Sequence, residues 1–166
     1  TGGVTPDWIQ YEFAAPAKLH EMWVWNSNQL IEDFVGFGAR DVTVEYSLDG
    51  ATWTVLEGAP EFARAPGLPT YAANTIIDFG GAMAQYVKLT INKSWGGVAP
   101  QTGLSEVRFY YIPTQARAPQ PAVAATGVGL DVELTWRPGR EAESHEVYLG
   151  TDESALTLAD TVSEPR

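Results

Sequence analysis

Several features that would assign a chemistry are missing from this sequence. It contains no cysteine, which excludes a disulfide framework and a thiol nucleophile and leaves the cellular compartment open. There is no Gly-x-Ser-x-Gly elbow and no phosphate-binding loop. The only two histidines, His20 and His145, lack metal-binding spacing, and we expect each to be a surface or edge residue. Acidic residues are plentiful enough for hydrolysis by paired carboxylates, but most lie beside turns or on the polar side of strands, where solvated carboxylates are expected. The sequence therefore predicts a protein that is not an enzyme.

Long apolar runs and basic residues are also scarce. No segment approaches the roughly 18 apolar residues of a membrane span, and no signal-peptide pattern opens the chain. Lys and Arg total 10 against 21 Asp and Glu, which gives a formal net charge of -11. This charge argues against nucleic acid and against an anionic membrane as partners. Neutral ligands or cations fit better.

Short β-branched and aromatic segments, separated by Gly, Pro, Asn and Asp, recur through the first two thirds of the chain. This pattern is typical of an antiparallel sandwich or barrel. The expected strands are residues 8–13, 19–26, 41–47, 52–56, 75–79, 86–91 and 103–112. Residues 29–37 fit either one helical turn or a structured loop, and we expect the loop.

Turns and tryptophans give further expectations. The pair Asp49-Gly50 predicts a tight hairpin with two residues at positive φ. Trp8, Trp53 and Trp136 begin or end regular strands, so we expect them in the core.

Four motifs in a fixed order carry a resemblance to a known family. They are Trp-Ile-Gln-Tyr-Glu-Phe at 8–13, Val-Glu-Tyr-Ser-x-Asp-Gly-x-x-Trp at 44–53 preceded by Arg40, Tyr-Val-Lys-Leu at 86–89 and Leu-Ser-Glu-Val at 104–107. This region resembles the discoidin, or coagulation-factor C-type, domain, which has the galactose-binding-like fold of family 32 carbohydrate-binding modules. The resemblance implies an antiparallel jelly-roll β-sandwich over residues 1–112. Such domains bind glycans, phospholipid head groups, collagen or proteins through loops at one end.

The composition changes at Pro113, where a proline-rich stretch over residues 113–121 predicts a stiff linker. Beyond it, residues 131–136 and 144–150 alternate as strands and resemble the start of a fibronectin type III or immunoglobulin-like domain. A complete domain of that kind needs about seven strands, so we expect residues 122–166 to be a partial module. The family also usually has a segment before its first core strand. We therefore expect an absent N-terminal strand, an open sheet edge and a larger multimodular polypeptide.

The candidate ligand-binding residues lie in loops. Asn26 and Asn28 follow a strand, and their amides can donate to and accept from sugar hydroxyls, although asparagine also favours turns. Trp95, in a polar glycine-containing loop, could stack on a pyranose or fold back as a lid. Arg64 could be a solvated surface residue. The resemblance implies that an arginine near this loop hydrogen-bonds a sugar hydroxyl.

Two further expectations concern a shared face and a metal. Trp23 and Trp25 face one way and Met22 and Val24 the other, and we expect the loop 57–74 to cover the tryptophans because an open pair would be a large apolar patch. The resemblance implies that Glu106 helps to hold a structural calcium ion. Calcium takes about six to eight oxygen ligands, so most of them would have to lie outside this chain.

The sequence thus predicts a non-catalytic carbohydrate-binding module of a bacterial protein that is secreted or displayed at the cell surface, with a neutral sugar such as a galactoside as its partner. Two alternatives remain. One is an adhesion or assembly module whose open sheet edge is completed by another chain. The other is an accessory region of a glycoside hydrolase.

Overall fold

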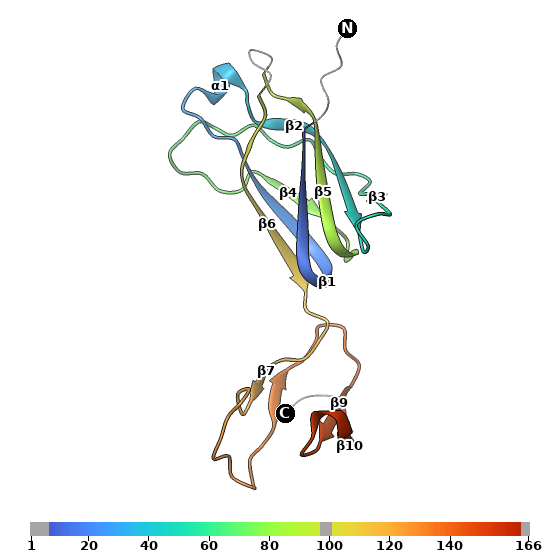
Figure 1. Cartoon of the computed structure of the whole chain (residues 1–166). Coiled ribbons are helices and arrows are strands. Elements are labelled where there is room, and N and C mark those ends of the chain that lie inside the picture. Colours follow the sequence, from blue (N-terminus) through green and yellow to red (C-terminus); the bar gives the residue numbers. More distant parts are fainter. Residues whose placement is uncertain (1–6, 97–100, 164–166) are drawn as a thin grey trace. The chain divides into compact units, whose positions relative to one another are not determined.

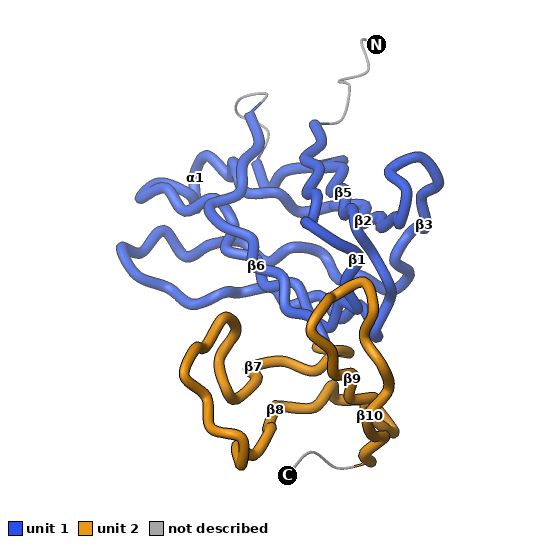
Figure 2. The backbone as a smooth tube through the Cα atoms, turned by 60° about the horizontal axis from the view of Figure 1, so that its bottom comes forward, with its two compact units in different colours: residues 1–112 blue, residues 113–166 orange. Residues whose placement is uncertain are grey.

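The computed structural model describes residues 7–96 and 101–163. The chain forms two compact units, Thr1–Ile112 and Pro113–Arg166 (Figure 2).

Unit 1 is an antiparallel all-β structure with one short helix (Figure 1). Its sheet has the order β3-β2-β5-β1-β4, and β6 also pairs with β1. The predicted all-β class is thus confirmed. The elements are β1 (Asp7–Asn26), α1 (Glu32–Val35), β2 (Ala39–Ser47), β3 (Thr54–Val55), β4 (Thr75–Asp78), β5 (Met83–Ser94) and β6 (Leu104–Ile112).

The long strand β1 makes the sheet curl. Its first part pairs with β5, from Asp7 opposite Ile91 to Glu12 opposite Tyr86. After a register shift between Glu12 and Ala17, its second part pairs with β4 and with β6. The two segments predicted separately are therefore one strand that belongs to both parts of the sheet, and the inner faces of these parts enclose the core.

The core of unit 1 follows from the period-2 alternation of its strands. The inward residues of β1, β2 and β5 form one buried cluster together with Phe62, Phe79 and Ile77. Its members are Leu19, Met22, Val24, Ala39, Val42, Val44, Phe62, Ile77, Phe79, Ala84, Val87, Leu89 and Ile91. Phe62 comes from the loop between β3 and β4 and is completely buried. The loop 57–74 therefore closes the core on the side of Met22 and Val24.

The predicted position of Trp8 is wrong. Its side chain is 62% exposed, because the inward positions of this part of β1 are Ile9, Tyr11 and Phe13. Trp53 is half-buried, and the Lys88 ammonium lies 4.3 Å from its ring centre.

The predicted tight turn is also wrong, although β2 and β3 do form an antiparallel hairpin. Residues 48–53 connect the two strands, and only Gly50 of the Asp49-Gly50 pair has a positive φ, of 71°. The Asp49 carboxylate instead accepts hydrogen bonds from the backbone N–H groups of Ala51 and Thr52, at 2.8 and 2.7 Å. An aspartate that binds the backbone ahead of it thus organises a wider turn.

Residues 29–37 contain the single helical turn α1 and are not the purely irregular loop that we expected. The turn ends at Gly36, whose φ is 62° and whose N–H donates to the Glu32 carbonyl at 2.8 Å. A Cβ atom on Gly36 would lie 2.3 Å from the backbone nitrogen of Gly96. Glycine is needed here both for the backbone conformation and for the close approach of two loops.

Unit 2 consists of two small antiparallel ribbons. One pairs β7 (Arg117–Gln120) with β8 (Thr135–Arg137), and the other pairs β9 (His145–Leu149) with β10 (Thr157–Val162), which follows the short 3-10 helix η1 (Glu153–Ala155). Strand β7 falls within the stretch expected to be a linker. In the described part of unit 2, Gly139 alone is buried. No helix among the described residues of the chain could cross a membrane.

Replacing Phe62 tests whether the loop closes the core. Phe62→Ala removes a fully buried ring and should lower the free energy of unfolding by about 3–5 kcal/mol. Leu68→Ala, in the same loop but 55% exposed, should change it by less than about 0.5 kcal/mol. Urea denaturation followed by circular dichroism measures the unfolding free energy of both variants. Equal losses in the two would contradict the role of Phe62 in closing the core.

Asp49 should make stability depend on pH. Hydrogen bonds from the backbone of Thr52 and Ala51, and then from Ser47, hold the pKa of Asp49 well below its ordinary value. Since the folded-state pKa is the lower one, the stabilisation is present above the unfolded pKa of about 4 and is lost as the pH falls below it. Asp49→Asn should lower the melting temperature at pH 7, with a smaller difference from the parent at about pH 3. Glu57→Gln, which changes an exposed carboxylate, is the control.

Candidate functional site

Three loops meet at one end of unit 1, near α1 (Figure 1). We call this surface the rim and define it as residues 27–38, 61–74 and 94–96. The Gly96 N–H donates to the Gly36 carbonyl at 2.7 Å, and the Phe62 N–H donates to the Arg40 carbonyl at 2.9 Å. The rim contains Asn28, Arg64 and Trp95, and Asn26 lies at its base. The fold thus gathers all four predicted ligand-binding residues in one region.

Asn26 belongs to the support of the rim. Its side-chain N–H₂ group donates to the carbonyls of Ala39 and Ala63, at 2.6 and 2.8 Å, and its side-chain oxygen accepts from the Ser27 N–H at 2.9 Å. Its main-chain carbonyl accepts from the hydroxyls of Ser105 and Tyr71. The residue is completely buried. Asn26 was predicted to bind the ligand, but in this conformation its buried side chain is out of reach of one. Its amide instead stabilises the fold.

Trp95 adopts the lid arrangement, the second of its two predicted alternatives. Its indole N–H donates to the Phe62 carbonyl at 2.9 Å, and the Arg40 guanidinium lies 5.6 Å from its ring centre. The side chain is half-buried. Trp95 thus joins the loop after β5 to the loop that closes the core, and it is not an open stacking platform.

Arg64 and Asn28 connect loops and also reach the surface. One terminal nitrogen of Arg64 donates to the Glu32 carbonyl, and its Nε lies 3.9 Å from the Asp33 carboxylate. The Arg64 side chain is 30% exposed. Asn28 is half-buried, and its Nδ2 donates to the Leu68 carbonyl at 2.5 Å. These contacts fix both side chains at the edge of the rim.

The exposed aromatic residue of the rim is Phe34, which sequence reasoning missed. It lies on α1 and is 76% exposed, beside Asp33, whose side chain is 86% exposed. Leu30, Ile31 and Leu68 add further exposed apolar surface. One sequence signal could have revealed this surface. Residues 29–37 contain several apolar side chains but lack the alternation of a strand.

Beneath α1, the rim holds a buried carboxylate. Glu32 is completely buried, and its Oε1 accepts from the Gly38 N–H at 2.7 Å, while its Oε2 has no hydrogen-bond partner. Burial raises the pKa of the Tyr71 hydroxyl, the hydrogen bond with Ser105 opposes this, and the charge of Glu32 adds to it. Tyr71 therefore remains protonated as a donor to Asn26.

The loop 57–74 does not play the covering role that we expected for it. Phe62 packs in the same core as Met22 and Val24, on the opposite face of β1 from the tryptophans. Trp23 and Trp25 instead contact Tyr110 and Arg108 of β6. Both tryptophans are half-buried.

Glu106 lies on β6 and forms an ion pair with Arg108, whose Nε donates to its Oε1 at 2.6 Å. Within residues 7–96 and 101–163, no group of three or more His, Asp or Glu side chains is placed to hold a metal ion. Calcium at Glu106 therefore stays a prediction, and it needs further ligands besides Glu106.

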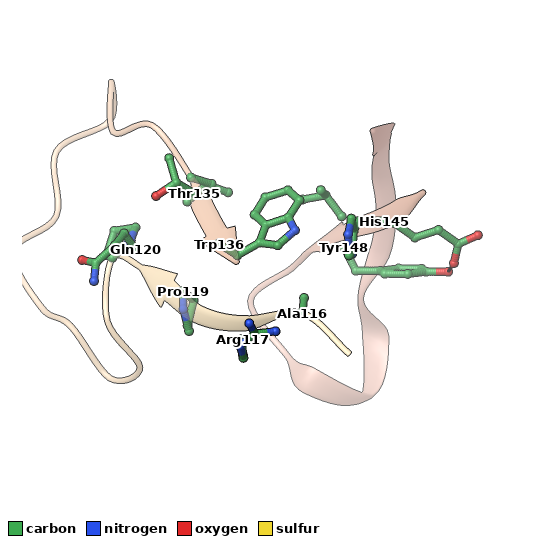
Figure 3. Close-up of a pocket in the computed structure, with 12 residues that line it drawn as sticks. Ala116, Arg117, Pro119, Gln120, Thr135, Trp136, His145 and Tyr148 are labelled. Atoms are coloured by element: carbon green, nitrogen blue, oxygen red, sulfur yellow. Dashed lines mark hydrogen bonds between the residues drawn. The ribbon is translucent and has the colours of Figure 1, made fainter. Parts of the chain in front are cut away.

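Unit 2 contains an open apolar groove of about 370 Å³ between its two ribbons (Figure 3). Trp136 and His145 meet edge to face in it, with ring centres 5.7 Å apart. The side chain of Trp136 is half-buried. The Nε1 of Trp136 and the Nε2 of His145 are buried without a hydrogen-bond partner. None of the predicted ligand-binding residues lies in this groove.

A scan of the chain against protein-family models finds no match, and a search of curated proteins finds none either. The function of unit 1 therefore has to be inferred from the geometry of the rim.

Asn26 should be essential for stability. Asn26→Asp keeps the shape but replaces two donated hydrogen bonds with a carboxylate facing the carbonyls of Ala39 and Ala63, and should cost at least about 2–3 kcal/mol of unfolding free energy. Asn28→Asp, at a half-exposed position, should cost less than about 1 kcal/mol. Thermal denaturation compares the two variants. A fully stable Asn26→Asp protein would contradict the supporting role.

Proposed function

We propose that unit 1 is a non-catalytic carbohydrate-binding module with the jelly-roll, galactose-binding-like fold that its motifs imply. It would belong to a multimodular bacterial protein that is secreted or displayed at the cell surface. Its ligand is a neutral glycan, with galactosides as the first class to test. The supporting observation is the exposed ring of Phe34 on α1, whose neighbour in the sequence, Asp33, has its carboxylate 3.9 Å from the Arg64 guanidinium.

These residue types match the chemistry of a sugar. A pyranose has an apolar C–H face that stacks on an aromatic ring, and Phe34 presents such a ring. The hydroxyls around that face require donors and acceptors. The Arg64 guanidinium supplies a charged N–H donor and Asp33 an exposed carboxylate acceptor, and Asn28 belongs to the same segment of the rim as Asp33. Phe34 thus takes the stacking role that the sequence suggested for Trp95.

The support beneath the rim makes this arrangement effective. Asn26 holds two loops to the end of β1, and Trp95 holds a third to Phe62. A surface that is ordered before binding loses less conformational entropy when a ligand arrives. Asn26 and Trp95 therefore act as positioning residues.

The electrostatics of the chain restrict the ligand. The net charge of -11 and the exposed Asp33 carboxylate disfavour phosphates, sulfates and uronates. A shallow site with one ring binds a single sugar weakly, and attachment to other modules raises the effective affinity.

A glycan array that includes galactosides, followed by calorimetry on the best binder, tests this proposal. Phe34→Ala should weaken binding about tenfold, because the variant loses one stacking contact and the ordered surface around it. Arg64→Ala should weaken it similarly through lost hydrogen bonds. Trp95→Phe keeps an aromatic ring but loses the hydrogen bond that positions its loop, and should weaken binding only about two- to threefold. Repeating the array with a chelator tests the calcium prediction.

Absence of binding to every neutral glycan on the array would argue against the proposal. Loss of binding in Trp95→Phe, with full binding in Phe34→Ala, would indicate that Trp95 and not Phe34 is the ring that stacks on the sugar.

One observation favours the alternative of assembly. Residues 7–12 of β1 pair with β5 on one side, and none of the strands described in the structure pairs with them on the other. This edge could accept a strand from another chain. A monodisperse monomer in light scattering would argue against it. An accessory role beside a glycoside hydrolase domain requires the same rim site and adds no contact of its own.

A further inference from the structure

A second aromatic surface lies on the outer face of unit 1, outside the residues that define the rim. We call it the aromatic face and define it as Trp23 and Trp25 of β1, Tyr110 and Arg108 of β6, and Ile76 of β4. In the strand register, Trp23 lies opposite Ile76 on one side and Arg108 on the other. The alternate residues Met22 and Val24 are completely buried. The aromatic face is thus the solvent side of three adjacent strands.

Its rings form a connected group. The ring centres of Trp23 and Trp25 are 6.4 Å apart, and those of Trp23 and Tyr110 are 4.9 Å apart. Ile76 is 49% exposed, and Tyr110 is 38% exposed. The solvated face of an antiparallel sheet normally carries polar residues, so this concentration of apolar side chains indicates a binding surface.

Charged groups at the edges fix the positions of the rings. The Trp23 indole N–H donates to Glu21 at 2.8 Å, and the Arg108 guanidinium lies 4.8 Å from the Trp25 ring centre. Arg108 is in turn paired with Glu106 at 2.6 Å. The surface therefore alternates aromatic rings with oriented donors and acceptors.

We propose that the aromatic face binds an extended neutral glycan chain, as a second subsite beside the rim. This inference rests on the proposed function. Successive sugar rings present C–H faces flanked by hydroxyls, which matches rings flanked by Glu21, Arg108 and Glu106.

The charges and size of the face argue against other partners. This side of the three strands also carries the carboxylates of Glu21, Asp78 and Glu106, which outnumber the guanidinium of Arg108 and disfavour polyanions. A stable protein interface needs about 800 Å² on each side with an apolar centre, whereas here charged pairs interrupt a small group of rings.

Nuclear magnetic resonance of the six indole N–H signals tests the proposal with neutral hexasaccharides of glucose, xylose, mannose and galactose and with the matching monosaccharides. At least one hexasaccharide should shift the Trp23 and Trp25 signals and leave Trp95 unchanged. Ile76→Asp, which alters an exposed side chain, and Trp25→Ala should each weaken hexasaccharide binding about tenfold. Neither should change monosaccharide binding at the rim.

Phe34→Ala separates the two proposals, because it should weaken monosaccharide binding about tenfold and leave the hexasaccharide shifts at Trp23 and Trp25. Sugar binding that depends on Phe34 alone, with no shift at these tryptophans, would overturn the aromatic face and keep the rim. Light scattering tests whether a second copy of the chain covers the aromatic face. A dimer of the parent chain that becomes a monomer in Ile76→Asp would show that a second copy occupies the face, and would also overturn the proposal.

Discussion

The hydrogen bonds of the buried Asn26 amide are the contacts on which the rim depends. One side chain at the end of β1 binds the carbonyls of Ala39 and Ala63, which belong to segments far apart in the sequence. Its main-chain carbonyl also accepts hydrogen bonds from the hydroxyls of Tyr71, in the same loop as Ala63, and of Ser105 in β6. An unpaired buried amide is costly, so each of these bonds stabilises the loops only while the others are made. Asn26 therefore orders the segments that begin β2 and contain Ala63, and Trp95 adds the third loop through its hydrogen bond to the Phe62 carbonyl.

The strand that leads to Asn26 determines the rest of unit 1. In β1, Met22 and Val24 enter the core while Trp23 and Trp25 remain outside, because successive side chains of a strand point to opposite faces. The same residues thus supply core packing, the aromatic face and, at Asn26, the support of the rim. A register shift of one residue would exchange these faces and disrupt all three.

The strands were predictable from sequence because their alternation is local, and the predicted segments correspond to β1 to β6. The turn at Asp49 was not, since Asp-Gly also occurs in wider turns closed by the aspartate side chain. Assigning Asn26 and Trp95 to the scaffold required partners 13 to 37 residues away, which no local pattern reveals. The sequence thus located the rim but did not distinguish its support from its surface.

The different positions of Trp95 and Phe34 have a physical cause. An indole has an N–H group that needs an acceptor when it is buried, and the free carbonyl of Phe62 supplies one, so Trp95 can pack inward at little cost. Phe34 has no polar atom to satisfy, and α1 directs its neighbours Glu32 and Val35 into the interior. A one-turn helix that buries these two residues leaves Phe34 on its outer side. The ring available for stacking is therefore set by the helical period of α1, and tryptophan content alone is a poor guide to where a sugar would bind.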